Sequence, residues 1–306
     1  MSSQSLHLQI ANAPCSWGVL EFEDQSTAGY DYTRVLDEMR AAGYDGTELG
    51  DWGFMPTDPR QLQDALAARA LALLGAFVPV RLAVPDAYDT GEAAALRTAT
   101  LMKDAGFPGA FIVLADDIAA SPERTAAAGR VTDDLRLPET ARTIFAANAE
   151  RIARAVRDST GVRTVFHHHC ASYIETAEEI ADLMRRTDPD LLGLCLDTGH
   201  LTYAGGDPVA AAAEFGSRIW HLHLKDCSPA VAERARTNGW NYNDAVRHGV
   251  FCELGQGSVR FPAVLEALGR SGFTGWAVVE QDVLPSLGTP AASAERNRNF
   301  IRTLGF

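Results

Sequence analysis

Cysteine is scarce in this chain of 306 residues, and its five cysteines are scattered without a Cys-x-x-Cys pair. This pattern argues against structural disulfides and a zinc ribbon, so the cysteines are expected to pack as small hydrophobic side chains. Long hydrophobic runs are also missing, since no stretch approaches the roughly 18 apolar residues of a membrane span. The N-terminus has no signal-peptide pattern. We therefore expect a cytoplasmic protein.

Positive charge is in deficit, with 27 Lys and Arg against 40 Asp and Glu, a formal net charge of −13. An acidic chain repels nucleic-acid phosphates and anionic lipid, so neither is expected as a partner. A Gly-rich nucleotide-binding turn is also missing after the first predicted strand, "LHLQIANAP". Its absence counts against a doubly wound dinucleotide-binding fold.

What the chain does contain is a regular alternation of short strand-like runs and amphipathic helical segments. Runs such as "AFIVLA" are apolar throughout, as is typical of parallel strands covered on both faces. Eight strand-like runs alternate with about eight helices, and no linker divides them. We predict a single-domain α/β fold, a (β/α)₈ TIM barrel, over residues 1–306. The predicted strands are residues 6–14, 45–50, 72–80, 110–116, 163–169, 191–200, 218–226 and 275–282.

Local signals support this division of the chain. Asp58 with Pro59 is typical of a helix start, and Thr176 with Glu179 has the spacing of a capping box. The segment 227–259 is long for a connection between strand seven and its helix, and it has helical patterning of its own. We predict a helical insertion there, over the top of the barrel.

Polar side chains gather where the predicted strands end, and six of the eight histidines are among them. In a TIM barrel the active site lies at these carboxyl ends. A lone buried histidine, or an aspartate before Thr-Gly, is more often structural, but four such strand ends together predict a metal site. Imidazole with carboxylate suits Mn²⁺, Fe²⁺, Co²⁺ or Zn²⁺. The residues at these ends are Glu48, His167, His168, His169, Asp197, His200, His221, His223, Lys225, Asp226, Glu280, Gln281 and Asp282.

The triplet "HHH" raises the question of which histidines serve one site. Successive side chains of a strand point to opposite faces, so His167 and His169 are expected to share the inner face. We expect His168 and His221 to point away and to act as structural support.

Two weaker features each have two interpretations. "GQGSVRF", residues 255–261, resembles a phosphate cradle, although a tight turn is the simpler interpretation because no strand precedes it. Trp17 in "CSWG" is either a hydrophobic wall for a ring-shaped substrate or an ordinary aromatic plug.

Several motifs resemble those of one known superfamily: "APCSWG", "TELGDWGFMPTDP", "LDTGHLTYAGGDP" and "HLHLKD". Along nearly its whole length the chain resembles the xylose-isomerase-like barrels, a superfamily of sugar isomerases, epimerases and dehydratases. Within it, the chain is most similar to the inosose (2-keto-myo-inositol) dehydratases.

The resemblance implies a set of metal ligands. Epimerase members hold a metal by Glu, Asp, His and Glu from strands five to eight, and the last three correspond to Asp197, His223 and Glu280. At strand five the chain departs from the pattern, with His167 in the glutamate position. Epimerases exchange protons on both faces of one carbon between two opposed carboxylates. Loss of one carboxylate therefore favours a lyase.

The resemblance implies a metal-dependent lyase that eliminates water from a keto-inositol or related keto-polyol through an enediolate. Mn²⁺ or Co²⁺ is expected, with Fe²⁺, Zn²⁺ or Mg²⁺ as alternatives. His200, His169 or Glu48 is expected to remove the proton, and Lys225 or a histidine to assist the leaving hydroxide. Trp17, His169, His200 and Lys225 are expected to contact the substrate.

Three alternatives remain open at this point. The first is a sugar isomerase or epimerase acting on a ketose, and the second is a lyase that eliminates from a 3-keto-glycoside. The third is a non-catalytic sugar-binding barrel. The resemblance also suggests a homo-oligomer, either a dimer or a tetramer.

Overall fold

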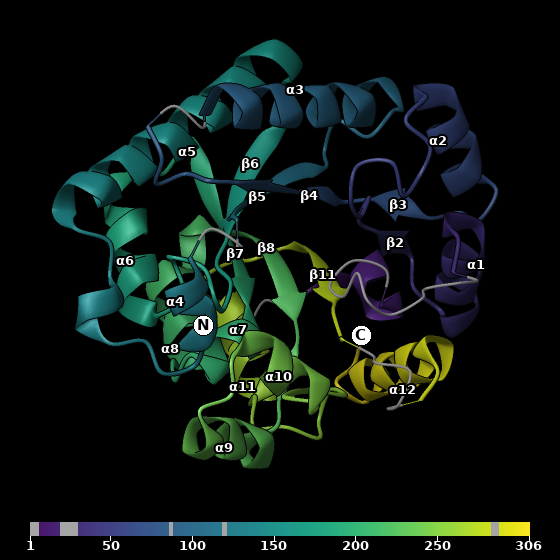
Figure 1. The fold of residues 1–306 in the computed structure, drawn as a ribbon. Helices are drawn as coiled ribbons and strands as arrows, with labels where there is room; N and C mark the ends of the chain where they lie inside the picture. Colours follow the sequence, from purple (N-terminus) through teal and green to yellow (C-terminus); the bar gives the residue numbers. More distant parts are fainter. Residues whose placement is uncertain (1–5, 19–29, 86–87, 118–120, 283–287) are drawn as a thin grey trace.

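The predicted barrel is confirmed by the structure, a computed structural model that describes residues 6–18, 30–85, 88–117, 121–282 and 288–306 (Figure 1). Nine parallel strand segments form the main sheet in the order β3-β2-β1-β11-β8-β7-β6-β5-β4. These segments are β1 (Leu8–Asn12), β2 (Gly46–Thr47), β3 (Ala72–Leu73), β4 (Gly75–Val80), β5 (Phe111–Asp116), β6 (Arg163–His167), β7 (Leu192–Asp197), β8 (Ile219–Leu224) and β11 (Gly275–Val279).

The barrel closes because β3 and β4 are two parts of one strand, separated only by Leu74. The Leu74 N–H donates to Thr47 O of β2 across 3.0 Å, and Leu74 O accepts from Phe111 N–H of β5 across 2.8 Å. The same residue is therefore bonded to both neighbouring strands. Nine segments thus make the eight strands that the sequence predicts.

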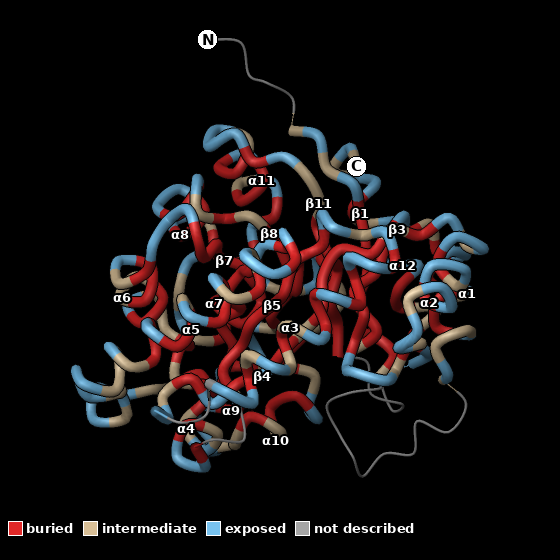
Figure 2. The backbone as a smooth tube through the Cα atoms, turned by 90° about the horizontal axis from the view of Figure 1, so that it is seen from above, coloured by how far each residue is buried: buried red, intermediate tan, exposed pale blue. Residues whose placement is uncertain are grey.

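A ring of eight helices surrounds the strands, so that the strands are buried and the outer helix faces are exposed (Figure 2). The predicted caps are confirmed: Asp58 accepts from Gln61 N–H, and Thr176 with Glu179 forms a capping box. The ring helices are α1 (Tyr32–Ala42), α2 (Pro59–Ala67), α3 (Tyr88–Asp104), α5 (Glu139–Thr160), α6 (Ala177–Arg186), α8 (Pro208–Phe215), α11 (Phe261–Arg270) and α12 (Pro290–Thr303).

The helical insertion after strand seven is also confirmed. It contains β9 (Asp226–Cys227), α9 (Pro229–Asn238), α10 (Tyr242–Arg247) and β10 (Phe251–Cys252), with β9 and β10 antiparallel. The sequence analysis missed two short helices, α4 (Pro122–Ala126) and α7 (Thr198–Tyr203). A small hydrophobic core of its own joins the insertion to Tyr203 of α7 and to Ala128, which follows α4. The insertion is therefore fastened to the carboxyl ends of the strands.

The glycine-rich segment 255–261 anchors this insertion. The backbone N–H groups of Gly255, Gly257 and Val259 all donate to the carboxylate of Asp226, at 2.9 to 3.0 Å. The anion that the turn binds is therefore the chain's own aspartate, and the tight-turn interpretation holds over the phosphate cradle.

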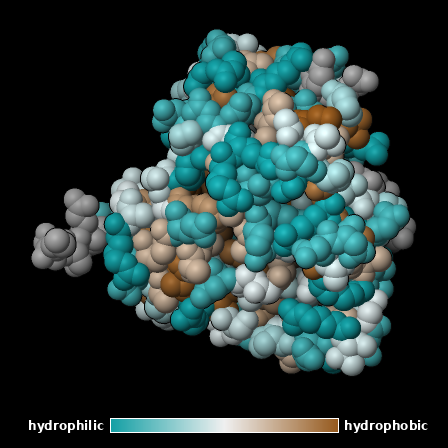
Figure 3. Space-filling view, turned by 90° about the vertical axis from the view of Figure 1, so that its left-hand side faces the viewer, coloured by the Kyte–Doolittle hydropathy of each residue, from teal (hydrophilic) through white to brown (hydrophobic). Residues whose placement is uncertain are grey.

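The molecular face on the side of α6 is largely hydrophilic, as Figure 3 shows. Ion pairs between neighbouring helices contribute there, because Arg186 of α6 contacts Glu139 of α5 at 2.8 Å. No helix among the described residues is long and apolar enough to cross a membrane.

Candidate metal centre

Four of the predicted ligands meet at the carboxyl ends of four adjacent strands. His167 ends β6, Asp197 ends β7, His223 lies near the end of β8, and Glu280 follows β11. These strands are neighbours in the sheet, so their last residues converge at the barrel mouth. One ligand atom from each residue lies within 4.8 Å of every other, and all four residues are buried. The structure therefore brings together the whole predicted ligand set.

Asp197 has two separate roles for its two oxygens. Its Oδ1 caps α7 by accepting from His200 N–H across 2.7 Å. Its buried Oδ2 makes no hydrogen bond within the described residues and lies 3.7 Å from His167 Nε2 and 3.9 Å from His223 Nδ1. The backbone N–H of Asp197 donates to His168 Nε2 across 3.1 Å, which is the supporting place expected for His168.

His223 is oriented by a carboxylate on its far side. Its Nε2 lies 2.9 Å from Glu48 Oε1, whereas its Nδ1 lies 3.2 Å from Glu280 Oε1. The network assigns a proton to Nε2, since Glu48 can only accept, so Nδ1 is the nitrogen that faces the cluster. Glu48 therefore positions a ligand and has its Oε1 already engaged.

His221 does not point away from the site, so that expectation was wrong. His221 and His223 are two residues apart on one strand, and a period of two places them on the same face. The structure accordingly places His221 Nε2 2.6 Å from Glu48 Oε1. One carboxylate oxygen thus joins both imidazoles.

The pKa values of the charged groups in the cluster are strongly shifted by burial and by the neighbouring charges. Burial opposes ionisation of Glu48, but His223 and His221 hold its pKa at about 2. Burial likewise opposes ionisation of Glu280, yet His223 and Lys225 hold its pKa well below the usual range. Burial also disfavours a charged His223, but Cys195, Glu280 and Glu48 raise the pKa of His223 well above its usual value. The ionised carboxylates therefore stabilise a positive charge at this position.

The residues present fit a divalent metal ion. Besides Asp197 Oδ2, the buried atoms His167 Nε2 and His223 Nδ1 make no hydrogen bond within the described part of the chain. Burial, with a further contribution from His223, lowers the pKa of His167 to about 3, so its imidazole is neutral and able to ligate. Two imidazoles with two carboxylates suit Mn²⁺, Fe²⁺, Co²⁺ or Zn²⁺.

Cys195 is a neighbour of the cluster that the sequence analysis missed. Its thiol groups with His167 and His223 in a second possible donor set. Burial raises the pKa of Cys195 to about 12, which keeps it a thiol and a poor ligand. Its place two residues before Asp197, on the same strand face, is the signal that would have found it.

The remaining predicted residues form a second layer beside the ligands. His169 Nδ1 lies 2.6 Å from Cys170 O, so Nδ1 carries the proton and Nε2 is the acceptor. The rings of His169 and His200 are 3.8 Å apart between centroids. Lys225 Nζ lies 3.4 Å from Glu280 Oε2 and 3.3 Å from Asp282 Oδ2.

Burial keeps both imidazoles of this layer neutral. Burial, together with His167, lowers the pKa of His169 to about 3. Burial and then His169 lower the pKa of His200 well below its usual value. Lys225 Nζ lies 3.5 Å from His200 Nε2, so the buried lysine side chain lies next to two neutral imidazoles, beside Glu280.

Two aromatic residues of the insertion complete the site and were missed in the sequence. The Tyr242 hydroxyl lies 3.4 Å from His169 Nε2. The Phe251 ring lies 4.8 Å from the His200 ring and 4.8 Å from Lys225 Nζ. The signal was present in the unusual length of the insertion and in its aromatic motif "GWNYN".

Trp17 lies apart from this group. It is only 2% exposed and belongs to the main hydrophobic core, where its indole N–H donates to Glu38 of α1 across 2.6 Å. Its position matches the aromatic plug rather than a substrate wall.

The closed eight-stranded barrel, with a buried His-Asp-His-Glu cluster at its carboxyl ends, defines a TIM barrel with a candidate metal centre. The chain belongs to the xylose isomerase-like TIM barrel family, whose model matches residues 29–304.

Several named proteins are similar to this chain over nearly its full length. Inosose dehydratase of Lacticaseibacillus casei is 28% identical over 96% of each chain. The rhizopine catabolism protein MocC of Rhizobium meliloti is 34% identical, covering 95% of this chain and 86% of that protein. Among solved structures, the IOLI protein with a binding zinc atom has a TM-score of 0.73 at 14% identity, covering 97% of this chain and 98% of that one.

Proposed function

We propose that the chain is a metal-dependent lyase that removes one water from a keto-inositol or a related keto-polyol. The observation that carries this proposal is the buried cluster of His167, Asp197, His223 and Glu280, whose ligand atoms converge on one point. The relatives named inosose dehydratase support the substrate class, because the similarity covers almost all of both chains. Mn²⁺ or Co²⁺ is the expected ion, ahead of Fe²⁺, Zn²⁺ or Mg²⁺.

A divalent ion held by these four residues would act as a Lewis acid toward the keto oxygen and a neighbouring hydroxyl of the substrate. His169 is the base that the geometry favours. Its Nδ1–H is held by Cys170 O, so its Nε2 lone pair has a fixed direction. Glu48 is a weaker candidate, since its Oε1 already accepts from two histidines.

Two side chains of this chain are enough for the elimination, one to accept a proton and one to donate a proton. The C–H bond beside the keto group breaks and His169 Nε2 takes the proton, while the electron pair forms a carbon–carbon double bond. The C–O bond one carbon further breaks, and the oxygen leaves as water with a proton from Lys225. Lys225 is 1% exposed and lies between the carboxylates of Glu280 and Asp282, which favour its charged form.

A lyase is favoured over an epimerase because of His167. An epimerase needs proton acceptors on both faces of one carbon, and the position at the end of β6 here holds an imidazole that is itself a candidate ligand. Elimination needs only one base and one acid on the substrate.

The test is incubation of the metal-loaded protein with 2-keto-myo-inositol in D₂O, followed by mass spectrometry and NMR. We expect a product that lacks one water, and no turnover after the metal is removed by a chelator. Full turnover without metal would contradict the proposal.

The same experiment separates the rival functions. Deuterium incorporation without loss of mass as water would indicate an isomerase or epimerase. Cleavage of a 3-keto-glucoside in place of inosose would indicate the glycoside-eliminating lyase. Sugar binding by calorimetry without either reaction would indicate a non-catalytic barrel.

A further inference from the structure

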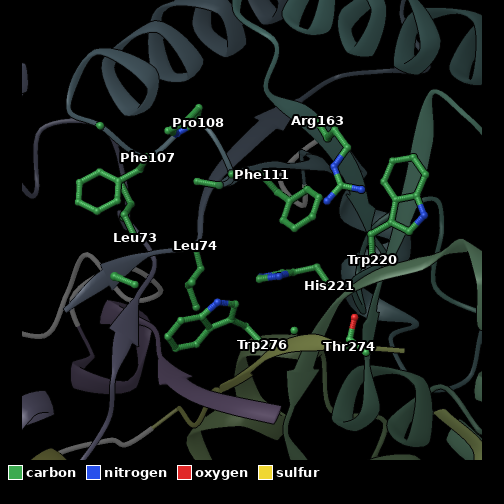
Figure 4. A pocket seen from close by; sticks show the side chains of 15 residues that line it. Leu73, Leu74, Phe107, Pro108, Phe111, Arg163, Trp220, His221, Thr274 and Trp276 are labelled. Carbon is green, nitrogen blue, oxygen red and sulfur yellow. The ribbon is translucent and has the colours of Figure 1, made fainter. Parts of the chain in front are cut away.

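Figure 4 shows a cavity, with a volume of about 390 Å³. The cavity lies at the opposite end of the barrel from the candidate metal centre. Its lining includes Phe111, Arg163 and Gly275, which are the first residues of β5, β6 and β11. The metal cluster, by contrast, is built from residues at the ends of strands. A ligand in this cavity would therefore be separate from the substrate of the barrel mouth.

Four aromatic rings form part of the cavity walls. Phe107, Phe111, Trp220 and Trp276 line it together with two leucines (Figure 4). The guanidinium of Arg163 lies over two of these rings, 4.7 Å from the centre of Phe111 and 5.2 Å from that of Trp220. Because its flat faces are used for stacking, the in-plane N–H donors of Arg163 remain at its edge.

The charge of the lining is unusual for so acidic a chain. Among the described residues, no Asp or Glu lines this cavity, nor an adjoining cavity of about 330 Å³ that shares Arg163, Trp220 and Thr274. Arg163 forms no ion pair within the described ranges, whereas other surface arginines such as Arg186 and Arg296 hold carboxylates. A protein of net charge −13 thus has an uncompensated cation at an aromatic opening.

The inner end of the cavity is polar. Figure 4 shows the imidazole of His221 reaching between Phe111 and Trp276. Its Nε2 is held by Glu48 across 2.6 Å, so the ring is fixed in direction. The cavity therefore combines flat apolar walls, a polar inner end and a cationic rim.

We propose that this cavity is a binding site for a small ring-shaped carboxylate. The ring lies between the aromatic walls, and the carboxylate accepts two hydrogen bonds from the edge of the Arg163 guanidinium. The volume lies in the range of small-molecule sites, at about 300–1,000 Å³. The inference does not depend on the reaction at the barrel mouth.

Calorimetry on the metal-loaded full chain tests this site with benzoate and cyclohexanecarboxylate as probes. Benzamide lacks the charge and acetate lacks the ring, so both are expected to bind more weakly than benzoate. Arg163→Gln is expected to raise the Kd for benzoate about tenfold, and Arg163→Lys to restore only part of the affinity, because lysine lacks the planar fork. Arg185→Gln, at an exposed arginine of α6, is the matched control and should leave the Kd unchanged.

Two results would overturn the proposal. The first is benzoate binding no tighter than benzamide or acetate. The second is an Arg163→Gln protein with wild-type melting temperature and unchanged benzoate affinity, because a carboxylate bound at the metal of the mouth would not respond to Arg163. Thermal melting of each variant by circular dichroism establishes that it is folded.

Discussion

His223 Nε2 lies 2.9 Å from Glu48 Oε1, and this contact decides which nitrogen of His223 faces the candidate metal centre. A carboxylate behind a ligand histidine fixes its tautomer and increases its basicity. Both residues are buried, Glu48 at 4% and His223 at 2% exposed, so water screens the effect only weakly. Glu48 thus influences the centre without belonging to the four converging ligands.

Glu48→Gln is expected to weaken metal binding by about 10–100-fold, because it removes the negative charge behind His223. The metal dissociation constant measured by calorimetry checks this. Glu139→Gln, at a largely exposed carboxylate on α5, is the control and should leave the constant unchanged. An unchanged constant for Glu48→Gln would refute this role for Glu48.

Asp197→Asn should distinguish the role of Asp197 as a helix cap from its role as a metal ligand. Asparagine is as good an N-cap as aspartate, so the α7 cap survives while the charged Oδ2 is lost. We expect a loss of metal and of activity with a melting temperature within a few degrees of the metal-free wild type. Asp58→Asn changes the corresponding cap of α2, which contributes nothing to the cluster, and should retain both metal and activity. Retention of stoichiometric metal by Asp197→Asn, measured by elemental analysis, would argue against Asp197 as a ligand.

Tyr242→Phe tests whether the insertion takes part in the chemistry. The substitution keeps the packed ring but removes the hydroxyl that lies 3.4 Å from His169 Nε2. If this hydroxyl orients His169 as the base, we expect kcat to fall about tenfold or more, with little change in melting temperature. Tyr203→Phe is the control, because Tyr203 is buried in the same small core and its hydroxyl has no partner in the described structure. Equal kcat values for the two variants would exclude a catalytic role for Tyr242.

Glu175 is expected to make stability depend on pH. Burial raises its pKa from 4.5 to about 7, against the lowering effect of hydrogen bonds from Gly129 and Ala171. The folded state therefore holds this proton more tightly than the unfolded state, so the free energy of unfolding falls as pH rises from about 4.5 to about 7. Thermal melts at pH 5 and pH 8 should show a smaller loss of stability for Glu175→Gln than for the wild type. A similar loss in both proteins would contradict the shifted pKa.

Much of this protein could be predicted from local patterns, because their causes are local. The caps at Asp58 and Thr176 depend on neighbouring backbone N–H groups, and the eight strands depend on short apolar runs. Asp197, His223 and Glu280 came from motif resemblance. The rule that strand ends converge in a barrel then placed them with His167 in one site.

The sequence by itself determined the eight strands, the ring of helices around them and the four converging ligands at the barrel mouth, since strand period and helix capping act over a few residues. Only the tertiary structure decided the contacts made across the barrel. Trp17 packs against α1, Glu48 bridges His221 and His223, and Tyr242 reaches His169 from a distant insertion. These contacts join residues far apart in the chain, and no local pattern encodes such distances.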